Sequence, residues 1–359
     1  MTLTLTLTER MARARGDLRM GVPVVLTEGA AAALVVAAEA LTPSRLLELR
    51  GLGVPELAIT ARRAATLKVA AYHGDLARLA LPSDAGVAWV AAVADPVDDL
   101  AVPMKGPFRP LRDGGAGLHR TALLLAKSAH LLPAVVVVPV AAGTVLDGLT
   151  VLAAEAALPE LQRLSPLHRV VAARLPMAAS DAGRVHVFRP DHGGEEHYAI
   201  EIGRPDRDHP VLARLHSACF TGDVLGSLKC DCGPQLRAGL AQMGAEGAGV
   251  LLYLNQEGRG IGLANKLRAY ALQDQGFDTV EANHRLGFED DERDFRLGAG
   301  LLRQLGFRAV RLMTNNPRKV DVMAGYGITV AERVPLRGFE TTANAGYLAT
   351  KAAKSGHLL

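Results

Sequence analysis

The chain has 359 residues, enough for two folded domains, and its 49% hydrophobic and 21% charged residues are typical of a globular protein. A formal net charge of +3 is too small to indicate a nucleic-acid partner. The most apolar run, residues 131–143, is interrupted by Pro133 and Pro139, so it predicts a buried strand and no membrane span. The three cysteines are clustered, which argues against a disulfide framework and predicts a cytoplasmic protein.

Helical and strand patterns alternate through the first half of the chain. We expect helices at residues 9–19, 42–52, 61–67 and 118–129, and strands at residues 22–26, 57–60 and 134–140. This alternation predicts an α/β layer structure for a first domain, residues 1–170. Residues 166–182 are expected to form a junction.

The second half predicts a mixed sheet with helices, so the overall fold class is α/β (α+β) with two domains. A hairpin is expected at residues 185–188 and 197–202, strands at 211–216, 248–254 and 309–313, and helices at 235–245, 263–275 and 295–305. Residues 278–294 are expected to form a polar loop. This domain is predicted to span residues 183–340, and residues 341–359 to form a flexible tail.

All three cysteines of the chain, Cys219, Cys230 and Cys232, lie within fourteen residues. Three thiolates can bind zinc and leave its fourth tetrahedral position open, as catalytic zinc requires. The alternatives are a small structural zinc knuckle or buried free thiols. The sequence offers no fourth cysteine to close a structural site, and this favours an open metal site.

Two strand-to-helix turns could face an anionic ligand. The first, residues 255–262, has three glycines at alternate positions and carries Glu257 and Arg259. Such turns direct backbone N–H groups towards anions, although an ordinary tight connection has the same pattern. A carboxylate can accept the N–H pair of a guanine-like edge, and an arginine can pair with phosphate. The second turn offers Thr314 and Lys319.

Further polar residues are less specific on their own. Lys266 and Tyr270 are four residues apart on one face of the expected helix, and Tyr270 could relay a proton or simply pack. The segment Glu289–Asp294 is strongly charged, and in isolation it is typical of a solvated loop.

Taken together, these motifs resemble the GTP cyclohydrolase II family, the zinc enzymes that start riboflavin synthesis. The resemblance covers residues 185–336. It rests on the Cys-x10-Cys-x-Cys pattern, Gln-Glu-Gly-Arg-Gly-Ile-Gly, Asn-Lys-Leu-Arg-Ala-Tyr, Asp-Thr-Val-Glu-Ala-Asn, the Asp-x-Arg-Asp loop and Thr-Asn-Asn-Pro-x-Lys.

The resemblance implies a role for each matching residue. The three cysteines would hold Zn²⁺, which activates water for attack on C8 of the guanine ring, and Tyr270 would assist proton transfer. Asp291 and Arg293 match the proton acceptor and the nucleophile for pyrophosphate release. Because a guanidinium is almost never deprotonated, Arg293 could instead stabilise charge at the α-phosphate. GTP would be bound by Arg214, Leu215, His216, Ser217, Gln235, Glu257, Gly258, Arg259, Thr279, Thr314 and Lys319.

The resemblance also implies Mg²⁺ with the triphosphate, a homodimer, and 2,5-diamino-6-ribosylamino-4(3H)-pyrimidinone 5′-phosphate, formate and pyrophosphate as products. One departure is Ala218, where the family usually has Glu before the first cysteine. Alternatives therefore remain: a paralogue that opens a different nucleotide ring or stops after one hydrolysis, or a non-catalytic zinc- or nucleotide-binding subunit. A structural zinc module for nucleic acid is least favoured.

The first domain resembles dihydroxybutanone-phosphate synthase in framework pieces such as Phe108–Arg112 and Leu124–Lys127. That family has a dense acidic metal-binding loop where this chain has Thr27–Ala33, and its His-Thr-Glu is replaced by Leu118-His119-Arg120. Without clustered carboxylates nothing would hold Mg²⁺ on a sugar phosphate. We therefore expect a catalytically inactive domain that has a scaffolding, dimerising or regulatory role, in which His119 is structural.

Overall fold

The computed structural model describes residues 4–141 and 147–336, so the predicted tail at 341–359 lies outside the described residues. The chain forms two compact units. Unit 1 comprises Met1–Arg163 together with Gly260–Glu292, and unit 2 comprises Leu164–Arg259 together with Arg293–Leu359. The sequence boundaries place residues 260–292 in the second domain, whereas these residues pack within unit 1.

Unit 1 is built on a sheet that has six strands among the described residues. The strands are β1 (Val24–Glu28), β2 (Ala31–Ala37), β3 (Glu56–Thr60), β4 (Leu76–Ala80), β5 (Ala134–Val140) and β6 (Thr150–Ala153). Their order is β4-β3-β5-β2-β1-β6, and every pair is antiparallel except β1 with β6. Apolar residues fill both faces because side chains alternate along each strand: on β5, Val136 enters one core and Val137 the other.

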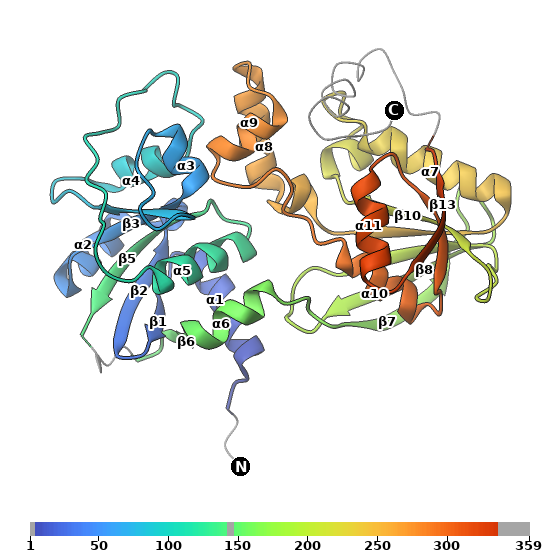
Figure 1. Cartoon of the computed structure of the whole chain (residues 1–359), viewed down its shortest axis with the longest axis horizontal. Coiled ribbons are helices and arrows are strands. Elements are labelled where there is room, and N and C mark those ends of the chain that lie inside the picture. The colour runs from blue at the N-terminus through green and yellow to red at the C-terminus, as the bar shows by residue number, and fades with distance from the viewer. Residues whose placement is uncertain (1–3, 142–146, 337–359) are drawn as a thin grey trace. The chain divides into compact units, whose positions relative to one another are not determined.

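Helices cover both faces of this sheet. One core joins it to α1 (Leu7–Arg19), α5 (Gly117–Ser128) and α6 (Ala154–Gln162). The other core joins it to α2 (Pro43–Leu52), α3 (Ala61–Thr66) and α4 (Val87–Ala94), together with α8 (Leu263–Asp274) and α9 (Thr279–Arg285). Figure 1 shows α8 and α9 in orange, whereas the rest of unit 1 runs from blue to green.

Helix α9 corrects the prediction of a continuous polar loop at residues 278–294. Asp278 caps the helix by accepting hydrogen bonds from the N–H groups of Val280 and Glu281, and Glu281 completes a capping box. Ala282 and Asn283 are buried. The helix has only seven residues and few apolar positions, so its pattern is too short to be recognised by periodicity.

Unit 2 is built on a sheet that has seven strands in the described part of the chain. They are β7 (Leu167–Arg174), β8 (Gly183–Pro190), β9 (His197–Ile202), β10 (Val211–Ser217), β11 (Gly249–Leu254), β12 (Ala309–Met313) and β13 (Thr329–Val334). In the order β13-β12-β10-β11-β9-β8-β7, the first four strands are mutually parallel and the rest antiparallel. The carboxyl ends of β10, β11 and β12 therefore share one edge, where α/β sheets usually bind ligands.

Helices also cover both faces of the unit 2 sheet. Ala213 of β10 packs in a core with α10 (Arg296–Gln304) and α11 (Pro317–Gly325). The neighbouring residue Leu212 points to the opposite face and packs with Met243 of α7 (Cys232–Glu246). Among the described residues, no helix is both long and apolar enough to cross a membrane.

The structure confirms the predicted fold class and the strongly patterned elements, including the β8–β9 hairpin. Two strands were not predicted. Strand β2 begins with three alanines, which have low strand propensity. Strand β7 lies in the expected junction at 166–182, and its side chains are mostly exposed, so it lacks an apolar alternation.

Candidate functional site

The sulfur atoms of the three cysteines converge just beyond the end of β10. Cys219 lies two residues after the strand and caps a single π-helical turn, Phe220–Val224, while Cys232 is the first residue of α7. The three sulfurs lie within 4.8 Å of one another, and the Sγ atoms of Cys219 and Cys230 are 3.7 Å apart. Cys219 and Cys230 are buried. Among the described residues, this is the one group of three metal-ligating side chains of this kind.

The backbone around Gly222 forms the wall of this sulfur cluster. The N–H of Gly222 donates a hydrogen bond to Sγ of Cys219 at 3.3 Å. A Cβ atom at position 222 would lie 2.7 Å from Sγ of Cys230 and 3.0 Å from Sγ of Cys219, so the position requires glycine. Hydrogen bonds with Cys219 and Cys230, and then burial, raise the pKa of the Cys232 thiol. A divalent cation would stabilise the thiolates and reverse that effect, so the donor set fits zinc.

Asp223 connects the cysteine turn to the ends of two strands, a role that the sequence did not indicate. Its carboxylate accepts hydrogen bonds from the N–H of Cys219 at 3.0 Å and the hydroxyl of Tyr253 at 2.9 Å, and it pairs with Nε2 of His216 at 3.0 Å. Burial, followed by the charge of Asp223, raises the pKa of Tyr253. Burial lowers the pKa of His216, although the bond to Asp223 opposes this. Tyr253 therefore remains a donor that fixes Asp223 against Cys219.

His216 and Tyr253 carried the only signal that could have revealed Asp223. They are register partners on the parallel strands β10 and β11, and their rings stack with centroids 5.5 Å apart. A sequence reading that aligned the carboxyl ends of these strands would have placed both polar side chains beside the cysteine turn.

Arg214 is a buried cation beside the sulfur cluster. Burial lowers its pKa to about 10, while the negative charge of Asp231 limits the fall, so the guanidinium stays charged at neutral pH. It donates to Oε1 of Gln235 at 2.6 Å, and Nε2 of Gln235 donates to Asp231 at 2.6 Å. Both ends of the Gln235 amide therefore hold charged neighbours in place, where the sequence predicts contact with the substrate.

The glycine-rich turn after β11 places Glu257 against the cysteine turn. Oε2 of Glu257 accepts a hydrogen bond from the N–H of Phe220 at 2.5 Å, and Oε1 accepts one from Gly258 at 2.9 Å. Gly258 and Arg259 both have φ of 63°, a left-handed conformation that is costly for arginine. Unit 2 thus brings two separate sequence motifs into direct contact.

Two further cations lie at this edge of the sheet. Nη1 of Arg293 approaches Oγ of Ser217 at 3.3 Å, and Nζ of Lys319 donates to the carbonyl of Leu215 at 2.9 Å. Both cationic groups lie over the ring of Phe295, 4.8 and 4.9 Å from its centroid. In the turn after β12, the hydroxyl of Thr314 accepts a hydrogen bond from the N–H of Asn316 at 3.0 Å. The arrangement gives this edge the positive charge that a phosphate ligand requires.

The remaining predicted site residues lie in unit 1. Tyr270 is half-buried on α8, with Nζ of Lys266 5.7 Å from its ring centroid, as expected for one helix face. Thr279 begins α9 and accepts a hydrogen bond from Gln273 at 3.1 Å. Asp291 lies in the acidic segment that follows this helix. The predicted site residues are thus divided between the two units.

Comparisons with known proteins agree with this site. A family described as GTP cyclohydrolase II matches residues 168–335. A GTP cyclohydrolase-2 from Azospirillum brasilense is 45% identical, over 96% of this chain and 93% of its own length. A GTP cyclohydrolase-2 from Escherichia fergusonii is 56% identical, over 54% of this chain and 97% of its own. A solved two-domain 3,4-dihydroxy-2-butanone 4-phosphate synthase from A. baumannii aligns with 90% of this chain and 99% of its own, at 19% identity and a TM-score of 0.34.

These findings define the protein as an enzyme, a hydrolase whose second unit carries a cysteine-lined site. The chain belongs to the GTP cyclohydrolase II family. The family resemblance identified in the sequence is therefore confirmed.

Proposed function

We propose that this chain is a zinc-dependent enzyme that hydrolyses GTP to 2,5-diamino-6-ribosylamino-4(3H)-pyrimidinone 5′-phosphate, formate and pyrophosphate, the first step of riboflavin biosynthesis. The observation that carries the proposal is the convergence of three cysteine sulfurs within 4.8 Å at the carboxyl edge of the parallel strands. Cys219, Cys230 and Cys232 would hold the ion. When bound there, zinc would supply Lewis acidity and lower the pKa of water.

The side chains around the cysteines would bind and orient the nucleotide. Glu257, with its carboxylate beside the cysteine turn, would read the guanine edge. Arg214 would stabilise negative charge that develops near the sulfurs, because its own charge is held by Gln235 and Asp231. Gly258 and Arg259 would approach the ligand through the strained turn.

The phosphates would meet the cationic edge. Lys319 and Arg293 would pair with phosphate oxygens, with Mg²⁺ accompanying the triphosphate. Arg293 lies at a hydroxyl and over an aromatic ring, and neither contact would remove its proton. We therefore assign it charge stabilisation at the α-phosphate, with Asp291 as proton acceptor, Tyr270 as proton relay and Thr279 as a substrate contact.

Incubation of purified protein with GTP and Mg²⁺, with and without a zinc chelator, tests the proposal. We expect formate, pyrophosphate and the pyrimidine in equal amounts, and loss of formate after chelation. Recovery on addition of zinc is the control for damage by the chelator. Full formate release from metal-free protein would contradict the proposal.

A second candidate is a non-catalytic zinc- and nucleotide-binding subunit, and Ala218 is the observation that favours it. This residue precedes Cys219, and its N–H donates to the carbonyl of Leu254 at 2.7 Å, so the position touches the end of β11 directly. Its methyl group offers no carboxylate to the cluster or to a substrate. Protein that binds zinc and GTP but releases neither formate nor pyrophosphate would identify this function. A paralogue would instead open a different nucleotide ring or stop after one hydrolysis.

We also propose a cytoplasmic homodimer. The three cysteines form no disulfide in the structure, which suits a reducing compartment. Sedimentation of the purified chain tests the oligomeric state, and a monomer at micromolar concentration would contradict the dimer.

A further inference from the structure

The segment Gly260–Glu292, which interrupts unit 2 in sequence, is built into the core of unit 1. Its apolar side chains share one hydrophobic core with strands β3 and β5 and helices α2 and α4. The contributing residues are Ile261, Ala269, Leu272, Ala282, Leu286 and Phe288, all of them at most 5% exposed. Burial on this scale means that the first 163 residues determine where this segment can lie.

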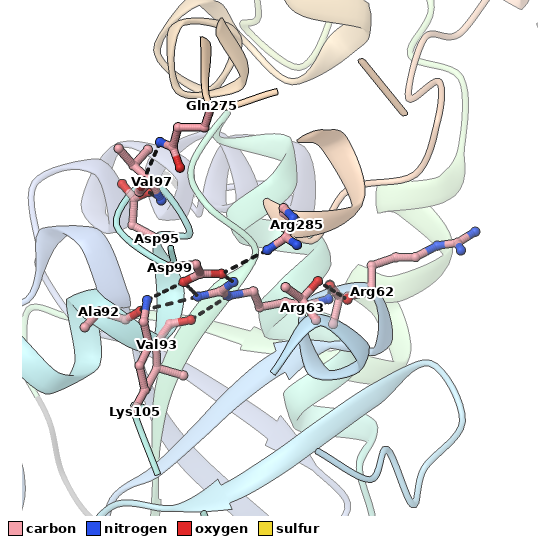
Figure 2. Close-up of polar contacts among 12 residues, drawn as sticks. Arg62, Arg63, Ala92, Val93, Asp95, Val97, Asp99, Lys105, Gln275 and Arg285 are labelled. Atoms are coloured by element: carbon pink, nitrogen blue, oxygen red, sulfur yellow. Dashed lines mark hydrogen bonds and ion pairs between the residues drawn. The ribbon is translucent and has the colours of Figure 1, made fainter. Parts of the chain in front are cut away.

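A buried charge cluster holds the end of α9. Asp99 pairs with Arg63 at 2.5 Å, with Lys105 and, at 3.7 Å, with Arg285 of α9 (Figure 2). Burial opposes ionisation of Asp99, but Arg63 and Lys105 outweigh it and lower its pKa. The carboxylate therefore stays charged and fixes Arg285.

Helix α8 has its own polar attachments to the same region. Arg268 pairs with Asp95 at 2.8 Å, and Gln275 donates to the carbonyl of Val97 at 2.8 Å (Figure 2). At the start of the segment, Asn265 donates to the carbonyl of His130 at 3.0 Å. These contacts hold the helix that carries Tyr270 at both of its ends.

The acidic end of the segment is held by two cations from the first 163 residues. Arg62 donates to Glu289 at 2.6 and 3.0 Å, and Nζ of Lys127 pairs with Oε1 of Glu292 at 2.6 Å. The same Oε1 accepts a hydrogen bond from the N–H of Glu289 at 2.9 Å, which closes the loop on itself. Glu292 directly follows Asp291 in the sequence and directly precedes Arg293.

Gly287 shows how closely the loop fits unit 1. Its carbonyl accepts a hydrogen bond from the hydroxyl of Thr60 at 2.7 Å. A Cβ atom there would lie 2.8 Å from that hydroxyl oxygen and 2.9 Å from Pro133, and φ is +89°. The loop that leads to Asp291 is therefore fitted to the surface of unit 1 at the level of single atoms.

We propose that Lys127 and Arg62 are positioning residues for the cyclohydrolase reaction: the N-terminal region acts as a seat that fixes the loop bearing Asp291 and the helix bearing Tyr270. This role rests on the proposed function, since it assigns those two residues to catalysis. It gives the N-terminal region a purpose that requires no active site of its own.

Charge reversal in the full-length protein tests the seat. Lys127→Glu places a carboxylate beside Glu292, so we expect kcat for formate release to fall about tenfold, as a displacement of about 1 Å can cost up to a hundredfold. The KM for GTP should stay within about twofold, because the groups at the β10–β12 edge are untouched. Glu292→Lys should behave alike, and the double variant Lys127→Glu with Glu292→Lys should recover most of the loss.

Arg120→Glu is the matched control. Arg120 lies on the same helix, α5, and its exposed ion pair with Asp75 is entirely within the first 163 residues. We expect wild-type kcat for this variant and wild-type zinc content in all variants. Wild-type kcat in Lys127→Glu, loss of its zinc, an equal fall in Arg120→Glu, or failure of the double variant to recover would each overturn the seat.

Hydrogen exchange separates this proposal from the proposed function. In Lys127→Glu, amides of residues 286–294 should exchange faster than in the wild type, whereas those of β10 and β11 should not change. If the wild-type protein releases no formate, the proposed function fails by itself. Unchanged exchange in residues 286–294 would then overturn the seat independently.

Discussion

The two units use buried charge in different ways. In unit 1, buried charged groups pair with one another: Arg63 and Lys105 with Asp99, and Arg78 and His119 with Glu56. In unit 2, Arg214 and Asp223 are also buried, but they surround three cysteine sulfurs. Neutralised pairs hold helices and loops together, whereas the charges around the sulfurs add to the field at a metal and an anionic ligand.

This difference explains why similar motifs indicate function in one unit and not in the other. A pair such as Arg63–Asp99 satisfies its own charge and has little left to offer a ligand. Arg293 and Lys319 instead contact a hydroxyl, a carbonyl and an aromatic face, none of which carries a negative charge. Substitutions in the two units should therefore separate stability from catalysis.

The largest expected effect is in the sulfur cluster. Gly222→Ala would force a methyl group to within 2.7 Å of Cys230 Sγ, so we expect loss of bound zinc and of several kcal/mol of transition-state stabilisation, about a thousandfold or more in rate. Zinc content and formate release measure this. Gly300→Ala on α10 is the matched control, since nothing lies within 4 Å of its added Cβ. A Gly222→Ala variant that keeps zinc and full activity would show that the cluster is not a metal site.

The counterpart in unit 1 should affect stability and leave the metal in place. Arg63→Met removes one partner of a buried pair, so we expect a loss of about 3 kcal/mol in the free energy of unfolding, near the lower end of such effects because Lys105 still neutralises Asp99. Urea unfolding measures the loss. Arg120→Met breaks an exposed pair and should cost less than about 1 kcal/mol. Equal losses in the two variants would remove the distinction between core and surface charge.

Asp223 lies between these extremes because it holds a cysteine without being a ligand. Asp223→Asn keeps the size of the side chain but weakens its bonds to Tyr253, His216 and the N–H of Cys219. We expect a fall of about 10- to 100-fold in zinc affinity or activity. Competition with a zinc chelator measures the affinity, and Tyr253→Phe, which removes one of these bonds, should show a smaller effect. Wild-type affinity in Asp223→Asn would show that the cysteine turn holds its shape alone.

The sequence predicted those parts of the site that depend on spacing along the chain. The cysteines could be recognised because they occur close together, and the Glu257 turn because it follows a strong strand. Asp223 was missed because its role depends on the register of two parallel strands, which periodicity does not give. The packing of residues 260–292 in unit 1 was missed for a related reason: Ala269 and Leu272 show that α8 has an apolar face but cannot show which core buries it.

The smallest effect concerns pH and a buried pair of unit 1. Burial opposes ionisation of Glu56, but the hydrogen bonds and charges of His119 and Arg78 outweigh it and lower its pKa to about 2, from an ordinary 4.5. Because the folded pKa lies below the unfolded one, the stabilisation is complete above pH 4.5 and is lost as the pH falls towards 2. Glu56→Gln should therefore cost about 1–2 kcal/mol at pH 7, and the difference from the wild type should shrink below pH 4.5.

Unfolding free energies between pH 7 and 3 measure this, and the exposed Glu48→Gln variant on α2 is the control that should follow the wild type. A difference that stays constant down to pH 3 would mean that the Glu56 variant acts through packing. In that case the buried carboxylates of unit 1 would contribute shape more than charge, and the contrast with the charged edge of unit 2 would become sharper.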